Sequence, residues 1–179
     1  VYNGMWFSPL KEAIDGFIPP GSMDEQWDVA GLEKSLEEDF GLLLPLQQWL
    51  DEDHALHEET LLQRVLDEAE QVYTDKEALF GADILRRVEK DVMLQVVDNH
   101  WKEHLAGMDY LRQGIGLRGY AQKDPKQEYK REAFGMFEHL LAKIKHDTVS
   151  FLMRIQAQAQ EPPLPEREPE QEMQFSHPE

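Results

Sequence analysis

Two histidines separated by four positions, with a glutamate between them, are the residues of this chain best suited to hold a metal. His100, Glu103 and His104 read H-x-x-E-H, the inverted zinc-protease pattern. On a helix, the two imidazoles share a face and could bind zinc. A catalytic zinc also needs a third protein ligand and a dry cleft, and no downstream glutamate stands out. We expect a polar patch with Trp101 as the core residue and no metal site; a helical metallohydrolase is the alternative.

Three glycines further along resemble a nucleotide-binding motif. Gly114, Gly116 and Gly119 match the dinucleotide spacing, but that motif needs a strand before it and a helix directly after it. A long helical pattern precedes these glycines, so they indicate a turn. The chain contains no Gly-x-x-x-x-Gly-Lys-Ser/Thr sequence and no local Ser–His–Asp arrangement. We therefore expect no catalytic residues in this chain.

The same turn is basic and aromatic, which suits contact with another molecule. Between Arg112 and Arg131 there are six cations and two anions, a local net charge of +4 in a chain whose net charge is −18. Tyrosine offers a large contact area and a hydrogen bond at low entropic cost. We predict a contact site made of Leu117, Arg118, Gly119, Tyr120, Ala121, Gln122 and Lys123.

Two long amphipathic helices must position this tip. Apolar residues at spacings of three and four predict one helix from Gly81 to Gln113, ended by Gly114 and Gly116. Asp124 is a good N-cap, and Pro125 a good first residue, for a second helix that runs to about residue 155. The pair predicts an antiparallel hairpin. Each helix has a wider apolar face than one partner covers, which predicts a further packing surface.

The first half of the chain predicts several shorter helices. We expect a short helix ending near residue 17, then helices near Val29–Phe40, Pro45–Asp51 and Glu58–Leu79. Ser22 and Glu25 fit a capping box, which predicts another helix start near Met23. From residue 24 to 70 the chain has fifteen carboxylates and two cations. A solvated outer face explains them; an acidic helical adaptor for a basic partner is the alternative.

Composition places the whole chain in the all-α class. Its 179 residues can bury a core, and almost no segment alternates with period two. Cysteine is absent, which excludes disulfides and thiolate ligands. We see no signal-peptide pattern and no apolar run long enough to span a membrane. The acidic balance argues against nucleic-acid binding. Residues 156–179, rich in Gln, Glu and Pro, predict a disordered tail.

Three stretches carry a family resemblance. IPPGSMDEQWDVAGLE, LPLQQWLDEDHALHEETL and, above all, HWKEHLAGMDYLRQGIGLRGYAQKDPKQEYKREAFGMFEHLL closely resemble the C-terminal third of the SecA family of bacterial preprotein translocase motors. The resemblance covers residues 12–155. Residues 1–11 are not matched; residues 1–17 loosely resemble argininosuccinate synthase, so they are either the end of a scaffold-like helix or a foreign segment.

The resemblance implies an organisation and a function. Residues 18–80 would be the helical wing domain, 81–155 the two-helix finger with its tip at 114–124, and 156–179 a linker that ends before any zinc-binding tail. The fingertip tyrosine would be Tyr120, contacting the SecYEG channel and the unfolded preprotein. ATP and Mg²⁺ would bind in motor domains absent here, so this chain itself would hold no cofactor.

The resemblance also implies partners and a location. The wing and finger would contact the rest of the motor, its scaffold helix and nucleotide-binding domains, and the parent could form a homodimer. The parent would lie in the cytoplasm and peripherally on the cytoplasmic face of the bacterial inner membrane. An anionic membrane surface would be reached only through the parent.

Overall fold

The structure, a computed structural model, describes residues 3–53, 56–117 and 124–156, apart from some side chains near the N-terminus. Across these ranges the chain forms α-helices and short 3₁₀ turns, with no strand, which confirms the all-α prediction. The elements are α1 (Asn3–Phe17), η1 (Asp24–Gln26), α2 (Val29–Phe40), α3 (Leu46–Glu52), α4 (Glu58–Phe80), α5 (Ala82–Gly114) and α6 (Pro125–Arg154). The predicted tail lies outside the described residues.

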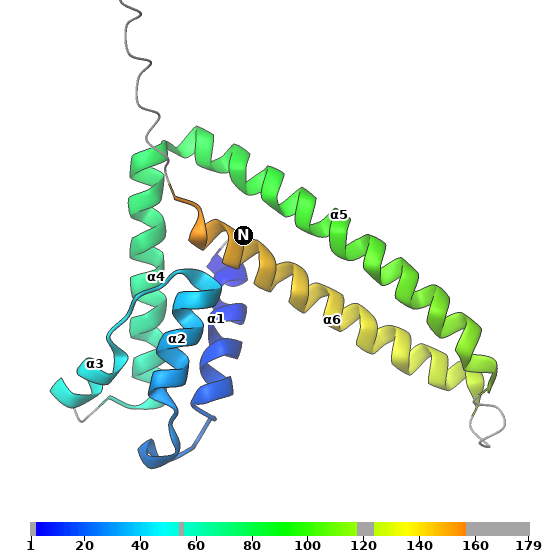
Figure 1. Cartoon of the computed structure of the whole chain (residues 1–179), viewed down its shortest axis with the longest axis horizontal. Coiled ribbons are helices and arrows are strands. Elements are labelled where there is room, and N and C mark those ends of the chain that lie inside the picture. The colour runs from blue at the N-terminus through cyan, green and yellow to red at the C-terminus, as the bar shows by residue number, and fades with distance from the viewer. Residues whose placement is uncertain (1–2, 54–55, 118–123, 157–179) are drawn as a thin grey trace, which may run out of the picture.

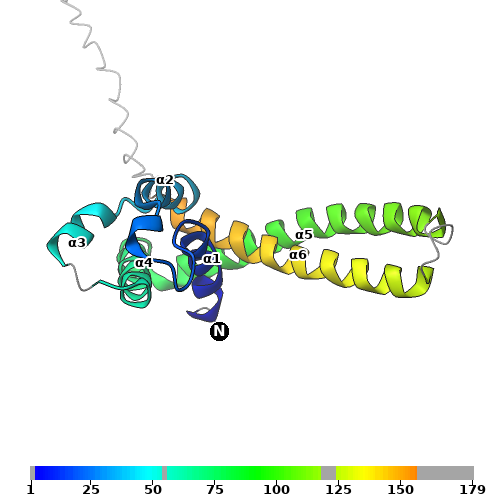
Figure 2. The same ribbon diagram turned by 90° about the horizontal axis from the view of Figure 1, so that it is seen from below.

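The helices form two regions of different shape. Helices α1 to α4 gather at one end, and α5 and α6 run antiparallel away from them (Figure 1, Figure 2). We call α1–α4 together with residues 148–154 of α6 the basal unit. We call α5 together with residues 125–147 of α6 the hairpin. The antiparallel hairpin predicted from the glycine-rich turn is confirmed.

The basal unit has its own hydrophobic core. In α2, Leu32, Leu36 and Phe40 recur every four residues, so their side chains share one face and are fully buried. Every helix of the unit except the 3₁₀ turn supplies core residues. The buried cluster consists of Leu10, Ile14, Ile18, Val29, Leu32, Leu36, Phe40, Leu42, Leu46, Trp49, Leu56, Leu61, Val65, Ala69, Val149 and Met153.

Helix α1 belongs to this core. Leu10 and Ile14 of α1 and Ile18 just after it are buried among residues of the other helices. The helix contacts α2, α4 and α6. A foreign segment would not need to present apolar residues at this spacing to the same core. The N-terminal segment is therefore an integrated element of the fold.

Local signals set most helix ends. The Asp28 carboxylate accepts a hydrogen bond from the Gly31 N–H at 2.9 Å and caps α2, and Gly41 ends the helix with a left-handed φ of 65°. The prediction of an α-helix that starts near Met23 is wrong, because only the short 3₁₀ helix η1 forms there. The Ser22 hydroxyl accepts a hydrogen bond from the Trp27 indole N–H at 2.9 Å instead of capping a helix.

The end of α6 is anchored in the basal unit. Val149 and Met153 lie in its core, and the Ser150 hydroxyl donates to the Asp39 carbonyl. The Lys76 ammonium donates to the carbonyls of Met153 and Leu152, which the helix end leaves without intrahelical partners. Burial lowers the pKa of Lys76. The last turns of α6 thus join the hairpin to the basal unit.

The hairpin has a narrow buried seam. Leu85, Val96 and Leu111 of α5 and Leu140 of α6 are buried along it. At Gly107 the helices come close, since a Cβ there would lie 2.7 Å from the Met136 methyl carbon. Long though they are, neither hairpin helix nor any other helix among the described residues is apolar enough to cross a bilayer.

Candidate functional site

The far end of the hairpin is the site that the sequence singled out. Helix α5 ends at Gly114, and Leu117 beyond it is 72% exposed. Helix α6 begins at Pro125, where the Asp124 carboxylate accepts a hydrogen bond from the Lys126 N–H at 2.9 Å. Gly114 and Pro125 thus lie at the ends of the two helices, Asp124 caps the second, and Gly116 lies in the short 3₁₀ turn that follows α5. The remaining predicted contact residues, Arg118, Gly119, Tyr120, Ala121, Gln122 and Lys123, lie outside the described residues.

Part of the positive charge near the tip is paired within the hairpin. Arg112 lies 3.2 Å from the Asp109 carboxylate, and Arg131 lies 2.8 Å from that of Glu128. These pairs are three residues apart on one helix, which stabilises helices only weakly at exposed positions. Glu128 is already counted in the local net charge of +4, so only Asp109 lowers the basic character of this end below that value.

One side of the hairpin exposes a broad apolar surface, which we call the apolar face. Its members are the exposed residues Leu94, Val97, Trp101 and Leu105 of α5 and Phe134, Phe137 and Leu141 of α6. The two helices present these residues on the same side, because the His104 ring contacts both Trp101, at 5.6 Å between ring centroids, and Phe137, at 6.3 Å. As the sequence predicted, each helix thus has a wider apolar face than its partner covers, and the uncovered part lies beside the seam.

Trp101 corrects a prediction. We expected it to be a core residue of the hairpin, but it is 46% exposed. A helix of 3.6 residues per turn places Trp101 on the stripe of Leu94, Val97 and Leu105, next to the seam and not in it. Within the hairpin, the smaller Val96 and Gly107 face α6 instead.

The histidine motif is part of a hydrogen-bonded link between the two helices. His100 Nε2 lies 2.6 Å from Asp147 Oδ2 on α6, and His100 Nδ1 lies 3.4 Å from Glu103 Oε2. A hollow of about 180 Å³ lies beside it, lined by His100, Glu103, His104, Met136, His139, Leu140 and Lys143. Over the described part of the chain, no three His, Asp or Glu side chains form a group that could hold a metal. The metallohydrolase alternative therefore gains no support from the geometry.

This link continues to the basal unit. His146 Nδ1 lies 3.0 Å from Asp147 Oδ1, and the His146 ring packs edge-on against Phe40 with 5.5 Å between centroids. Burial opposes the ionisation of Asp147, but the hydrogen bonds from His146 and His100 outweigh it and hold the pKa of this carboxyl below its ordinary value. Asp147 was not a predicted site residue, and only its position about six turns along an expected helix hinted at it.

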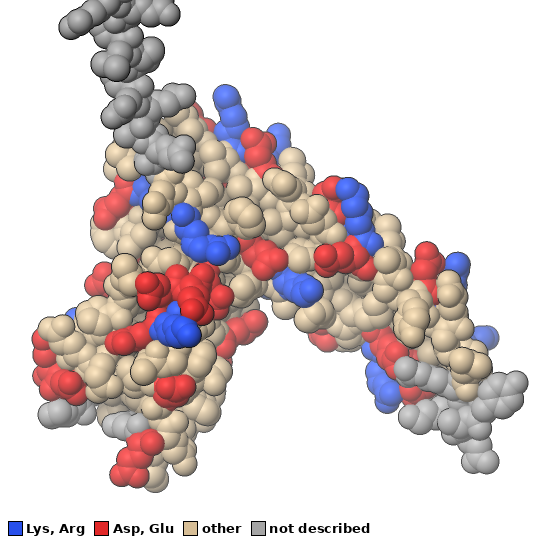
Figure 3. Space-filling model, in the orientation of Figure 1, with Lys and Arg blue, Asp and Glu red and all other residues tan. Residues whose placement is uncertain are grey.

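Acidic side chains gather on the basal unit, while charges of both signs alternate along the hairpin (Figure 3). Several of these carboxylates hold local structure. Glu33 accepts a hydrogen bond from the Gln47 N–H at 3.0 Å, and Glu58 accepts one from the Gly21 N–H at 2.8 Å. Fewer carboxylates are therefore free to bind a basic partner, as the acidic adaptor alternative would require, than the sequence count suggests.

A helical base that carries a long antiparallel hairpin with an exposed apolar face defines an all-α protein of two regions. A family model described as "SecA Wing and Scaffold domain" matches residues 2–156. The chain therefore belongs to the SecA family, as the resemblance predicted. The match begins at residue 2 and so includes residues 2–11, which the resemblance does not cover, in agreement with the packing of α1.

Individual relatives agree with the family model. The chain is 54% identical over 175 residues to "Protein translocase subunit SecA" of Ectopseudomonas mendocina, covering 94% of this chain and 19% of that protein. It is 57% identical over 159 residues to the same subunit of Thiobacillus denitrificans, covering 89% of this chain and 18% of that protein. The chain thus spans about a fifth of the length of these relatives.

Proposed function

We propose that this chain acts as the wing and two-helix finger of a protein translocase motor, with residues 18–80 as the wing and 81–155 as the finger. One observation carries the proposal: α5 and α6 leave the basal unit as a long pair of helices whose far ends, at Gly114 and Pro125, are remote from its core. Membership of the family supports the same assignment.

The contact residues of the finger are those of its tip. In the sequence, Tyr120 stands between the cations Arg118 and Lys123, three residues after Leu117, which is exposed. An aromatic ring with a hydroxyl group contacts varied side chains and hydrogen-bonds to a peptide backbone, which suits a substrate of changing sequence. The proposed partners are the mouth of the SecYEG channel and an unfolded preprotein inside it.

The energy for movement would come from outside this chain. The sequence has no phosphate-binding P-loop, so ATP and Mg²⁺ would be held by other domains of the motor. Those domains, with the scaffold helix, would pack on the apolar face, since a surface of this kind on a monomer marks an interaction site. The motor would then work on the cytoplasmic side of the bacterial inner membrane, where the channel opens.

The test compares two tyrosines of the hairpin in the complete motor. Tyr120→Ala should strongly reduce translocation of a preprotein into inverted membrane vesicles, because it removes the tip contact. ATP binding should stay close to that of the unmodified protein. Tyr110→Ala is the matched control, since Tyr110 is 80% exposed on α5 outside the tip and should leave translocation nearly unchanged. Equal translocation by both variants would contradict the proposal.

A further inference from the structure

A carboxylate is buried where the hairpin meets the basal unit. Glu89 of α5 is only 2% exposed and lies on the same side of the helix as the buried Leu85 and Val96. An ionised group in such a place is costly unless other groups pair with it. Its surroundings therefore show what this position does.

Four side chains, two from each helix, form the network around Glu89. The Tyr73 hydroxyl of α4 donates to Glu89 Oε1 at 2.5 Å, and the Arg86 guanidinium pairs with the same oxygen. Arg86 also reaches back to α4 and lies 2.6 Å from Glu77 Oε2. Burial, reinforced by the hydrogen bond to Glu89, raises the pKa of Tyr73, so its hydroxyl remains a donor at neutral pH.

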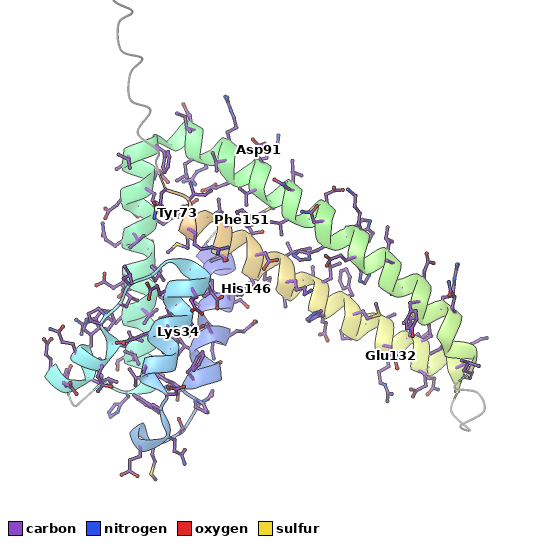
Figure 4. All side chains as sticks on the ribbon, in the orientation of Figure 1. Lys34, Tyr73, Asp91, Glu132, His146 and Phe151 are labelled. Carbon is purple, nitrogen blue, oxygen red and sulfur yellow. The ribbon has the colours of Figure 1, made fainter. Side chains whose placement is uncertain are left out.

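The network spans the junction between the two helices. Helix α4 ends and α5 begins at Gly81, whose φ of 83° favours glycine. Tyr73 and Glu89 each lie eight residues from Gly81, or about 12 Å along each helix. Figure 4 shows Tyr73 on the part of α4 that lies beside the start of α5 and the end of α6. Their hydrogen bond thus links α4 and α5 across the angle that the two helices make at Gly81.

The length of these arms makes the contact sensitive to that angle. At about 12 Å from Gly81, a change of about 10° moves the two groups apart by about 2 Å, which breaks a hydrogen bond. Helix α5 has 33 residues and is therefore about 50 Å long. The same change would move its far end by about 9 Å.

We propose that the contact of Tyr73 with Glu89, supported by Arg86 and Glu77, is a latch that fixes the angle at which the hairpin leaves the basal unit. The end of α6 is one attachment between the two regions, and the latch on α5 is the second. With both in place the hairpin has one orientation. With the latch open, it tilts on the remaining attachment and on Gly81.

The chemistry of the carboxylate makes the latch releasable. Glu89 Oε2 is buried, and no group among the described residues hydrogen-bonds to it in the latched state. Opening the angle would expose this oxygen to water, which offsets part of the lost contact with Tyr73. The two states are therefore closer in free energy than a fully satisfied network would allow. This inference concerns geometry and stands without the proposed function.

The test measures the angle directly. The chain has no cysteine, so spin labels can be placed at two introduced cysteines, Gln63→Cys on α4 and Gln113→Cys at the far end of α5, both exposed. Pulsed electron–electron double resonance on the whole chain then gives the distribution of distances between the two spin labels. We expect one narrow distribution in the otherwise unmodified chain.

Two conservative variants open the latch. Tyr73→Phe removes only the hydroxyl, and Glu89→Gln weakens its acceptor. Both should broaden or shift the distribution by up to about 9 Å. Tyr110→Phe, the same change at an exposed site of the hairpin, should leave it unchanged. Distributions that remain as narrow in Tyr73→Phe and Glu89→Gln as in the control would overturn the latch.

A third variant separates a latch from a merely stabilising contact. Glu89→Leu replaces the buried carboxylate by an apolar side chain, while the half-exposed Arg86 keeps Glu77 as its partner. No buried charge is then left unpaired, so thermal stability should be maintained or raised. The latch predicts a broad distance distribution together with an unchanged or higher melting temperature. A narrow distribution in Glu89→Leu would show that packing alone sets the angle. No translocation is measured, so failure of the latch leaves the proposed function untouched.

Discussion

The basal unit and the hairpin are both helical, but they bury their apolar residues very differently. Phe40 of the basal unit is fully buried, whereas Phe134 of the hairpin is 62% exposed. The basal core receives side chains from five helices, while α5 and α6 can cover only one side of each other. A pair of helices with wide apolar stripes therefore retains an apolar face. The basal unit thus buries its large apolar side chains internally, whereas the hairpin leaves several of its own exposed.

Two phenylalanine variants, one in each region, should show the largest difference in the free energy of unfolding. Phe40→Ala should lower the free energy of unfolding by about 4 kcal/mol, because it leaves a cavity among packed side chains. Phe134→Ala should lower it by less than about 1 kcal/mol, since its ring is already largely in water. Urea titrations of both variants measure the difference. Similar losses would mean that the two regions do not differ in packing.

A substitution at the junction between the two regions should lower the free energy of unfolding by less than Phe40→Ala does. Tyr73→Phe removes a hydrogen bond to a buried carboxylate and should lower the free energy of unfolding by about 2 kcal/mol. Tyr110→Phe should change it by less than about 0.5 kcal/mol. Thermal unfolding monitored by circular dichroism compares them. No loss in Tyr73→Phe would indicate that the buried network adds nothing to stability.

Loss of the cap at the start of α6, at the opposite end of the hairpin, should have a smaller effect on stability. Asp124→Ala removes the cap of the Lys126 N–H and should cost about 1 kcal/mol of helix stability. Hydrogen exchange should show faster exchange in the first turn of α6 and unchanged exchange in the basal unit. Asp109→Ala, inside α5, is the control and should leave that turn protected.

The smallest effect concerns pH. The pKa of Asp147 is lowered in the folded chain, so its ionised form adds stability above its ordinary value of 3.8. That contribution is lost as the pH falls through the still lower folded value. Asp147→Asn should therefore be less stable than the unmodified chain near neutral pH, and the gap should close below about pH 4. Denaturant titrations across this range check it, with the exposed Asp98→Asn as control; a gap that widens in acid would contradict the assignment.

Much of the fold could be predicted because the signals are local. Glycine and capping residues gave the bounds of α2 and the starts of α4 and α6 to the residue. The periodic apolar residues of α5 and α6, separated by glycines and Asp124-Pro125, predicted the hairpin. The Ser22 and Glu25 pattern failed, because Trp27 offered the Ser22 hydroxyl a better partner in the folded chain.

Features that depend on how the helices pack against each other could not be predicted from such local signals. Trp101 fits an apolar stripe, but which stripe faces the partner helix depends on the crossing of α5 and α6 at Gly107 and Met136. Glu89 looks like any other charged residue of a long helix. Its position four residues after Leu85 placed it on a buried stripe, yet its partner Tyr73 is supplied by a different helix.

One crosslinking measurement tests most directly whether the hairpin tip, and not the basal unit, meets the translocating chain. A photoreactive phenylalanine analogue would replace Tyr120 in one sample and Gln63, an exposed residue of α4, in another, each in the complete motor bound to a preprotein held midway through the channel. The account predicts crosslinks to the preprotein from position 120 and none from position 63. Crosslinks from position 63 alone would contradict it.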